Sequence, residues 1–161
     1  MGRLSVPRHG QAAFFVREAR RGDIAAIVAL LADDPLGQSR EEPADMAAYD
    51  RAFDEVAAQQ GNLLLVAERD GAIVGCLQLT VIPGLSRRGM RRAQIEGVRV
   101  AASCRGAGLG EALVRHAVER ARAGGCGLVQ LTTDRSRGDA HRFYERLGFA
   151  ATHLGMKLIL D

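Results

Sequence analysis

The chain has 161 residues, and its 22 Lys and Arg residues exceed its 19 Asp and Glu residues by only three charges. Hydrophobic residues make up 47% of it, which indicates one soluble globular domain. No apolar run approaches the ~20 residues that span a membrane, and so small an excess of positive charge does not require nucleic acid as a partner. The basic start lacks the apolar stretch of a secretory signal. We therefore expect a cytoplasmic protein with a loose tail over residues 1–13 and one domain over residues 14–161.

The first half of the chain alternates patterns of strand and helix. Asp23 precedes apolar residues at helical spacing, and Asp70-Gly71 is a dipeptide typical of a tight hairpin. In chain order we expect a strand at 14–19, a helix after Asp23, a polar loop at 33–43, a second amphipathic helix containing Met46, Tyr49, Phe53 and Val56, and strands at 62–68 and 72–82.

The second half begins with a basic loop at residues 83–92 and then alternates strand and helix. We expect a strand at 93–100, a helix at 109–122, a strand at 128–133, a helix at 139–147 that Gly148 ends, and one or two strands at 151–160. The whole order, β-α-α-β-β-β-α-β-α-β, is typical of an α/β (α+β) domain with a mixed sheet flanked by helices.

The three cysteines, Cys76, Cys104 and Cys126, lie far apart and form no Cys-x-x-Cys pair. No cysteine or histidine has the spacing of a zinc ligand, so we predict no metal. We interpret the cysteines as free thiols. Cys104 lies beside the loop described next, and a catalytic thiol there is the alternative.

The most informative segment is a glycine-rich loop between a predicted strand and a predicted helix. It reads Arg105-Gly106-Ala107-Gly108-Leu109-Gly110. Glycines remove side chains where backbone N–H groups approach an anion, and the helix start adds a positive dipole end. The loop lacks the Gly-Lys-Ser/Thr of nucleotide triphosphatases and the spacing of the dinucleotide fingerprint. A tight turn with no ligand remains the alternative.

This loop resembles the Arg/Gln-x-x-Gly-x-Gly/Ala signature of the GNAT N-acetyltransferase superfamily. A second segment, Ala140-His141-Arg142-Phe143-Tyr144-Glu145-Arg146-Leu147-Gly148-Phe149, is similar to that family's Ala-x-x-Phe-Tyr-x-x-x-Gly-Phe. The resemblance covers roughly residues 14–160. It implies a single-domain acyl-CoA N-acyltransferase fold with a mixed central sheet of 6–7 strands, about four helices, and splayed strands four and five.

The resemblance also implies an enzyme that moves acetyl from acetyl-CoA, its cosubstrate, to a primary amine of a small molecule or peptide, by direct attack in a ternary complex. In the family the glycine-rich loop holds the pyrophosphate of coenzyme A, and amides of the fourth strand polarise the thioester. Gly97 suits a bulge in that strand. Many members carry Asn where this chain has Arg137. The implied cofactor-binding residues are Val98, Arg99, Val100, Arg105, Gly106, Ala107, Gly108, Leu109, Gly110, Glu111, Arg137, Ala140, Phe143 and Tyr144.

Two residues are the catalytic candidates. Tyr144 matches the family's tyrosine that protonates the leaving thiolate, although it also lies on an apolar helical stripe and can simply pack. Glu96 is two residues before Val98, which predicts the same strand face. It is interpreted as a general base, as a group that binds the acceptor amine, or as a structural residue. His141 is a weaker base candidate.

Charge leaves the acceptor undecided. Asp33, Asp34, Glu41, Glu42 and Asp45 favour a cationic acceptor or form a solvated loop. Arg87, Arg88, Arg91 and Arg92 favour an acidic acceptor, a partner subunit or solvation. The rival interpretations are a non-catalytic acyl-CoA sensor of the same fold and a nucleic-acid-binding regulator, against which the 4% aromatic content counts. We expect no nucleic-acid or membrane partner and a possible homodimer.

Overall fold

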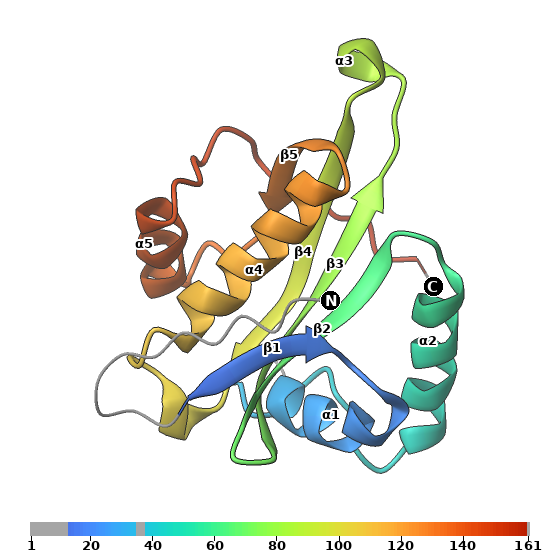
Figure 1. The fold of residues 1–161 in the computed structure, drawn as a ribbon, viewed down its shortest axis with the longest axis vertical. Coiled ribbons are helices and arrows are strands. Elements are labelled where there is room, and N and C mark those ends of the chain that lie inside the picture. The colour runs from blue at the N-terminus through green and yellow to red at the C-terminus, as the bar shows by residue number, and fades with distance from the viewer. Residues whose placement is uncertain (1–12, 35–37, 161) are drawn as a thin grey trace.

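The computed structural model describes residues 13–34 and 38–160, which form one mixed sheet with helices on both faces (Figure 1). The predicted tail lies outside these residues, apart from residue 13. The elements, in chain order, are β1 Phe14–Glu18, η1 Arg21–Asp23, α1 Ile24–Ala32, α2 Met46–Ala58, β2 Asn62–Arg69, β3 Ala72–Ile82, α3 Ser86–Gly89, β4 Arg91–Val100, η2 Ala102–Cys104, α4 Leu109–Ala123, β5 Cys126–Leu131 and α5 Gly138–Arg146.

The sheet has the order β1-β2-β3-β4-β5. The first three pairings are antiparallel, and β4 and β5 run parallel, as a strand–helix–strand crossover through α4 requires. Asp70 and Gly71 join β2 to β3 with φ angles of 52° and 78°, which are typical of the predicted two-residue turn. Most elements therefore lie within a few residues of their predicted positions.

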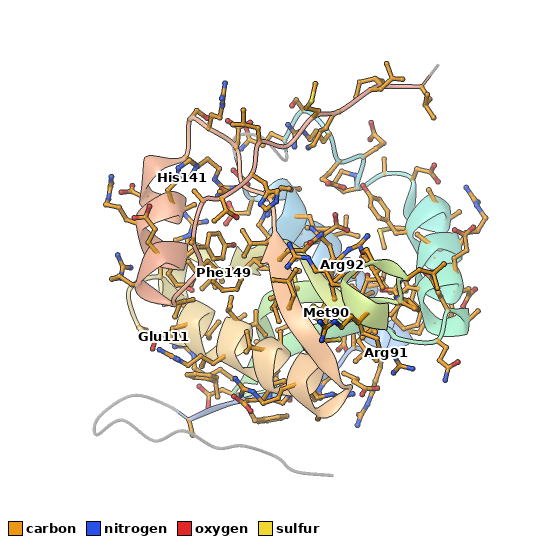
Figure 2. All side chains as sticks on the ribbon, turned by 90° about the horizontal axis from the view of Figure 1, so that it is seen from above. Met90, Arg91, Arg92, Glu111, His141 and Phe149 are labelled. Carbon is orange, nitrogen blue, oxygen red and sulfur yellow. The ribbon has the colours of Figure 1, made fainter. Side chains whose placement is uncertain are left out.

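The prediction of 6–7 strands is wrong for the described residues, which contain five. The missing strands are those predicted at 151–160. There the chain leaves α5 and runs toward α2 without pairing (Figures 1 and 2). Its apolar side chains alternate in sequence but stay exposed: Leu154 is 77% exposed and Met156 95%. Apolar residues are present in this segment, but none of the described strands pairs with it.

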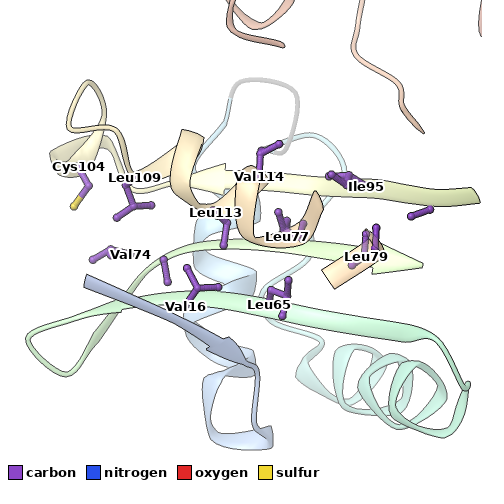
Figure 3. Close-up of a cluster of buried hydrophobic side chains, with 14 residues drawn as sticks. Val16, Leu65, Val74, Leu77, Leu79, Ile95, Cys104, Leu109, Leu113 and Val114 are labelled. Atoms are coloured by element: carbon purple, nitrogen blue, oxygen red, sulfur yellow. The ribbon is translucent and has the colours of Figure 1, made fainter. Parts of the chain in front are cut away.

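Two apolar clusters cover opposite faces of the sheet. The larger one packs α4, through Leu113, Val114 and Ala117, against alternate residues of β2, β3 and β4 (Figure 3). The smaller one packs Ile27 and Leu30 of α1 against β2 and β3. The helix α2 packs on β2. The face of β4 and β5 that lies away from α4 is therefore less fully covered by helices.

The loop between β3 and β4 projects from the body as α3 (Figure 1). Arg87, Arg88 and Gly89 have left-handed φ angles of 54°, 60° and 77°, so α3 is one left-handed turn. With it the described part of the chain contains five α-helices, where about four were predicted, and β4 begins at Arg91 rather than residue 93. No helix in residues 13–34 or 38–160 combines the length and apolar character needed to cross a bilayer.

Candidate functional site

The strands β4 and β5 pair along only half of β4. Their register ends at Ile95 opposite Leu131, while β4 continues to Val100. Residues 96–100 therefore have β3 on one side and no strand on the other. On this stretch, the edge of β4 that pairs with β5 in residues 91–95 has no strand partner. Its backbone groups are therefore available to a ligand.

A bulge lies in the unpaired part of β4. Cys76 pairs with Arg99 and Gln78 with Glu96, so Leu77 alone faces both Gly97 and Val98. Gly97 has a φ of 61°, which glycine adopts without the cost a side chain imposes. The predicted bulge at Gly97 is thus present in the structure.

The bulge corrects one expectation about Glu96. Ile95 and Val98 both pack in the cluster under α4 although they are three residues apart, because the extra residue resets the alternation of faces. Glu96 projects from the opposite face and is exposed. The prediction that Glu96 and Val98 share a face is therefore wrong.

The amides of Val98 and Val100 point into the opening. The Ala101 amide donates to the Val74 carbonyl of β3 at 2.9 Å, and Arg99, two residues earlier, is paired with Cys76 of β3 in the same register. Since successive amides of a strand point to opposite edges, those of residues 98 and 100 face away from β3. They form a pair of donors at the edge of the gap.

The glycine-rich loop begins where β4 ends and leads directly into α4. The backbone amides from Gly106 to Glu111 donate no hydrogen bond to any part of the described chain; the first amide of α4 with a partner is that of Ala112, which donates to Gly108 at 3.0 Å. Six consecutive free N–H groups at a helix start form a site for an anion.

Conformation explains two of the three glycines in this loop. Gly106 and Gly108 have φ angles of 79° and 78°, and a Cβ on either would have no neighbour within 4 Å. Their open side is available to a ligand. Gly110 differs, because its Cβ would lie 3.5 Å from Val100 and 3.6 Å from Phe143, which is ordinary contact. Its position therefore marks where α4, β4 and α5 meet, and it does not face an open side. The Leu109 side chain is 2% exposed in the core, so only its backbone is available at the site.

A buried carboxylate bridges two walls of the opening. Asp34, at the end of α1, is 7% exposed. Its Oδ2 lies 3.2 Å from Arg99 Nη2 on β4 and 3.2 Å from Arg137 Nη1 at the start of α5. Arg99 also donates to the Val98 carbonyl at 3.0 Å, while its Nε is buried without a partner. The carboxylate thus links β4 to α5 where the strands no longer pair.

The neighbouring charges are more exposed. Arg105 lies 3.8 Å from Asp33, and Glu111 pairs with Arg115 at 2.9 Å within α4. Asp33 and Asp34 together connect the end of α1 to the glycine-rich loop, to β4 and to α5. The sequence had favoured solvation or a cationic acceptor for these acids, and their arginine partners were not foreseen.

Tyr144 lies on the inner face of α5, with its ring centroid 5.0 Å from that of Phe143 and 5.8 Å from that of Phe149. Burial raises the pKa of its phenol above the usual 10, against a smaller lowering by the positive charges of Arg137 and Arg99. Its hydroxyl has no hydrogen-bond partner in the described residues. Tyr144 is therefore a protonated donor near neutral pH. Ala140, the other predicted residue of this face, is half-buried on α5.

The weaker candidates have other surroundings. The His141 ring bonds to the Asp134 carbonyl at 2.9 Å. His116 is on α4, and burial lowers its pKa. Cys104 is 1% exposed in the core, which argues against a catalytic thiol. The cysteines are free. Within residues 13–34 and 38–160 no three His, Cys, Asp or Glu residues gather as metal ligands.

The acidic loop and the basic loop differ in how many of their charged residues have partners within the protein. Asp45 caps α2 by accepting from the Ala48 amide, and Glu41 accepts from the Tyr49 hydroxyl at 2.9 Å. The acidic residues of that loop thus include several with structural partners. In the basic loop, Arg91 donates to the Gly124 carbonyl at 3.3 Å, and Arg92 turns to the other face (Figure 2).

Comparison with known proteins gives one family. Residues 24–149 match the family described as "Acetyltransferase (GNAT) family". A glucosamine 6-phosphate N-acetyltransferase of Trypanosoma brucei brucei is 41% identical over 90 residues, which are 56% of this chain and 59% of that protein. The match thus spans about three fifths of the trypanosome protein.

Two further matches cover more of the chain. Glucosamine 6-phosphate N-acetyltransferase 1 of Oryza sativa subsp. japonica is 36% identical over 124 residues, 74% of this chain and 73% of that protein. A crystal structure titled as a transcriptional regulator from Bacillus halodurans C-125 is 48% identical, with a TM-score of 0.88 over 91% of this chain and 99% of that one.

Proposed function

The chain belongs to the acetyltransferase (GNAT) family, and from this premise we propose that it transfers acetyl from acetyl-CoA to a primary amine of a small molecule or peptide. The observation that carries the proposal is the row of six unpaired amides from Gly106 to Glu111. They lie at the start of α4, next to the unpaired edge of β4. One end of the site suits linked phosphates and the other suits an extended thioester arm.

The binding step rests on charge and backbone. Pyrophosphate oxygens accept from the loop amides, each such bond contributing roughly 1.5–3 kcal/mol, and the helix dipole adds about 0.3–1 kcal/mol. Arg105 and Arg137 are exposed cations beside this path. The pantetheine arm enters the gap between β4 and β5 and replaces the missing strand pairing with hydrogen bonds of its own.

The chemical step has three parts. The amine nitrogen attacks the thioester carbonyl, whose oxygen gains negative charge and is stabilised by the amides of Val98 and Val100. A preset donor of this kind contributes ~10²–10³ in rate. The carbon–sulfur bond then breaks, and the thiolate takes the phenolic proton of Tyr144, which its raised pKa keeps in place until that moment.

Glu96 supplies the last function, removal of the amine's proton. Its carboxylate is exposed, beside the bulge. Because it lies on the face away from α4, it acts on an acceptor that approaches from that side, directly or through water. The alternative, that Glu96 only binds the ammonium group, predicts an unchanged pH–rate profile in Glu96→Gln. A profile in Glu96→Gln that loses its rising limb supports the base.

Two assays test the function. Acetyl-CoA should raise the melting temperature of the protein, and at least one member of a panel of primary amines should release free CoA thiol from acetyl-CoA in the presence of the protein. Tight binding without thiol release from any amine supports the rival interpretation, a non-catalytic acyl-CoA sensor. No binding and no release refutes the proposal. Cytoplasmic location, a homodimer and the lack of nucleic-acid or membrane partners stay predictions.

A further inference from the structure

A row of polar side chains crosses the face of the sheet that lies away from α4. On β4, Arg92, Gln94 and Glu96 alternate with Ala93 and Ile95, and these last two are buried under α4. The first three therefore share the other face.

Neighbouring strands extend the row. Thr80 of β3 and Gln130 of β5 lie directly opposite Gln94 in the registers. Gln130 Nε2 donates to Gln94 Oε1 at 2.8 Å, and Thr80 Oγ1 donates to Asn62 Oδ1 of β2 at 3.1 Å. These side chains are half-buried. Each amide group keeps at least one donor or acceptor for a ligand.

Opposite charges stand at the two ends of the β4 row. The side chains of Arg92 and Glu96 make no hydrogen bond or ion pair with the described residues, unlike Arg91 on the other face. They are four positions apart on the strand, or about 13 Å between Cα atoms. Glu96 is at the bulge that borders the gap, and Arg92 is at the far end, near α3 (Figure 2).

We propose that this face binds the acceptor, and that the acceptor is a small amine carrying an anionic group such as a phosphate, with Glu96 at the ammonium end and Arg92 at the anion. The inference rests on the proposed function. A half-buried row of amides and hydroxyls suits a ligand with hydroxyl groups between its two charged ends. A guanidinium without a partner suits a phosphate, which it binds with paired hydrogen bonds.

The proposal accounts for the apparent conflict between the acidic and basic loops. Asp34, Glu41 and Asp45 have partners within the protein. Arg99 also projects to the open side of β4, but it is paired with Asp34. Of the β4 charges on this side that have no partner in the described residues, the acid Glu96 lies beside the gap and the base Arg92 lies distant from it. An acceptor that carries both an ammonium group and an anionic group can pair with both Glu96 and Arg92. A simple diamine would instead place a second positive charge beside Arg92.

The test uses matched amines that differ only in the phosphate: glucosamine with glucosamine 6-phosphate, and ethanolamine with phosphoethanolamine. Wild-type enzyme should show the higher kcat/KM for the phosphorylated member of at least one pair. Arg92→Gln should raise KM for that amine at least 10-fold, the loss expected for one charged hydrogen bond. It should leave KM for the unphosphorylated partner and for acetyl-CoA unchanged.

Arg88→Gln changes an exposed arginine of α3, just before β4; it is the control and should change neither constant. Arg92→Lys should restore part of the lost affinity. Calorimetric titration of the phosphorylated amine into the protein–CoA complex gives the same comparison without turnover. Equal kcat/KM within both pairs, or an equal rise of KM for both members in Arg92→Gln, overturns the assignment. If no amine releases CoA, the transferase proposal fails, and this one with it.

Discussion

Replacing Asp34 by asparagine removes one negative charge and almost no volume. In the folded protein that charge lies 3.2 Å from Arg99 Nη2 and 3.2 Å from Arg137 Nη1, and the Asp34 side chain is 8% exposed. The variant leaves two guanidinium groups facing each other across an amide. We therefore expect the variant to lose stability and to loosen the link between β4 and α5 beside the gap.

The exposed fractions of the two arginines set the magnitude. Removing one member of a fully buried pair costs about 3–5 kcal/mol, and an exposed pair contributes about 0–1 kcal/mol. The Arg99 side chain is 20% exposed and that of Arg137 is 42% exposed, so Arg137 can turn to water and Arg99 cannot. We expect a loss of about 2–3 kcal/mol. For a domain of this size that lowers Tm by roughly 4–12 °C.

Urea denaturation of the wild type and of Asp34→Asn measures this loss. Asp33→Asn is the matched control, because Asp33 is adjacent but 59% exposed and 3.8 Å from its arginine; it should cost less than about 0.5 kcal/mol. A double-mutant cycle with Arg137→Gln should show coupling between the two sites. If Asp34→Asn costs no more than Asp33→Asn, the bridge does not brace the site and this reasoning is wrong.

Three further predictions concern single residues. Gly108→Ala places a side chain at a φ of 78°, which costs roughly 1–2 kcal/mol. Because the loop would then leave the conformation that presents its amides, calorimetry should show weaker acetyl-CoA binding. Gly22→Ala, in open space without a positive φ, is the control and should bind acetyl-CoA as the wild type does. Tyr144→Phe should lower kcat by ~10²–10⁴ with little change in acetyl-CoA affinity, and wild-type kcat should fall as the pH rises past 10 and through the raised pKa of Tyr144; unchanged turnover in the variant removes the acid role. Burial, with a smaller effect of Arg120, lowers the pKa of His116 below 6.5. As the pH falls below 6.5, the unfolded chain therefore takes up more protons than the folded one, and the free energy of unfolding declines. In His116→Gln this free energy should depend less steeply on pH, and an equally steep dependence would contradict the prediction.

The sequence predicted the elements whose signals are local. The turn at Asp70-Gly71, the helix start at the glycine-rich loop and the bulge at Gly97 all follow from glycines whose positive φ the structure shows. The five strands of the sheet also lie within a few residues of the ranges that the sequence predicted. These features depend on residues close together in the chain.

The features that the sequence did not predict depend on distant partners. One or two strands were predicted at residues 151–160, but a strand also needs a neighbour, and none of the described strands pairs with this segment. The Asp34 bridge joins residues 65 and 103 positions apart, which no local pattern encodes. The face of Glu96 was predicted wrongly because the alternation was counted through the bulge.

The central claim is that main-chain amides between Gly106 and Glu111 hold linked phosphates. Calorimetric titration with acetyl-CoA and with S-acetyl-pantetheine, which lacks the phosphates and the adenosine attached to them, tests it most directly, with S-acetyl-4′-phosphopantetheine, which keeps one phosphate and no adenosine, as the control. With two or more charged hydrogen bonds of roughly 1.5–3 kcal/mol each, acetyl-CoA should bind at least about 100-fold more tightly. Equal affinities for acetyl-CoA and S-acetyl-pantetheine, or no detectable binding of acetyl-CoA, would contradict the account.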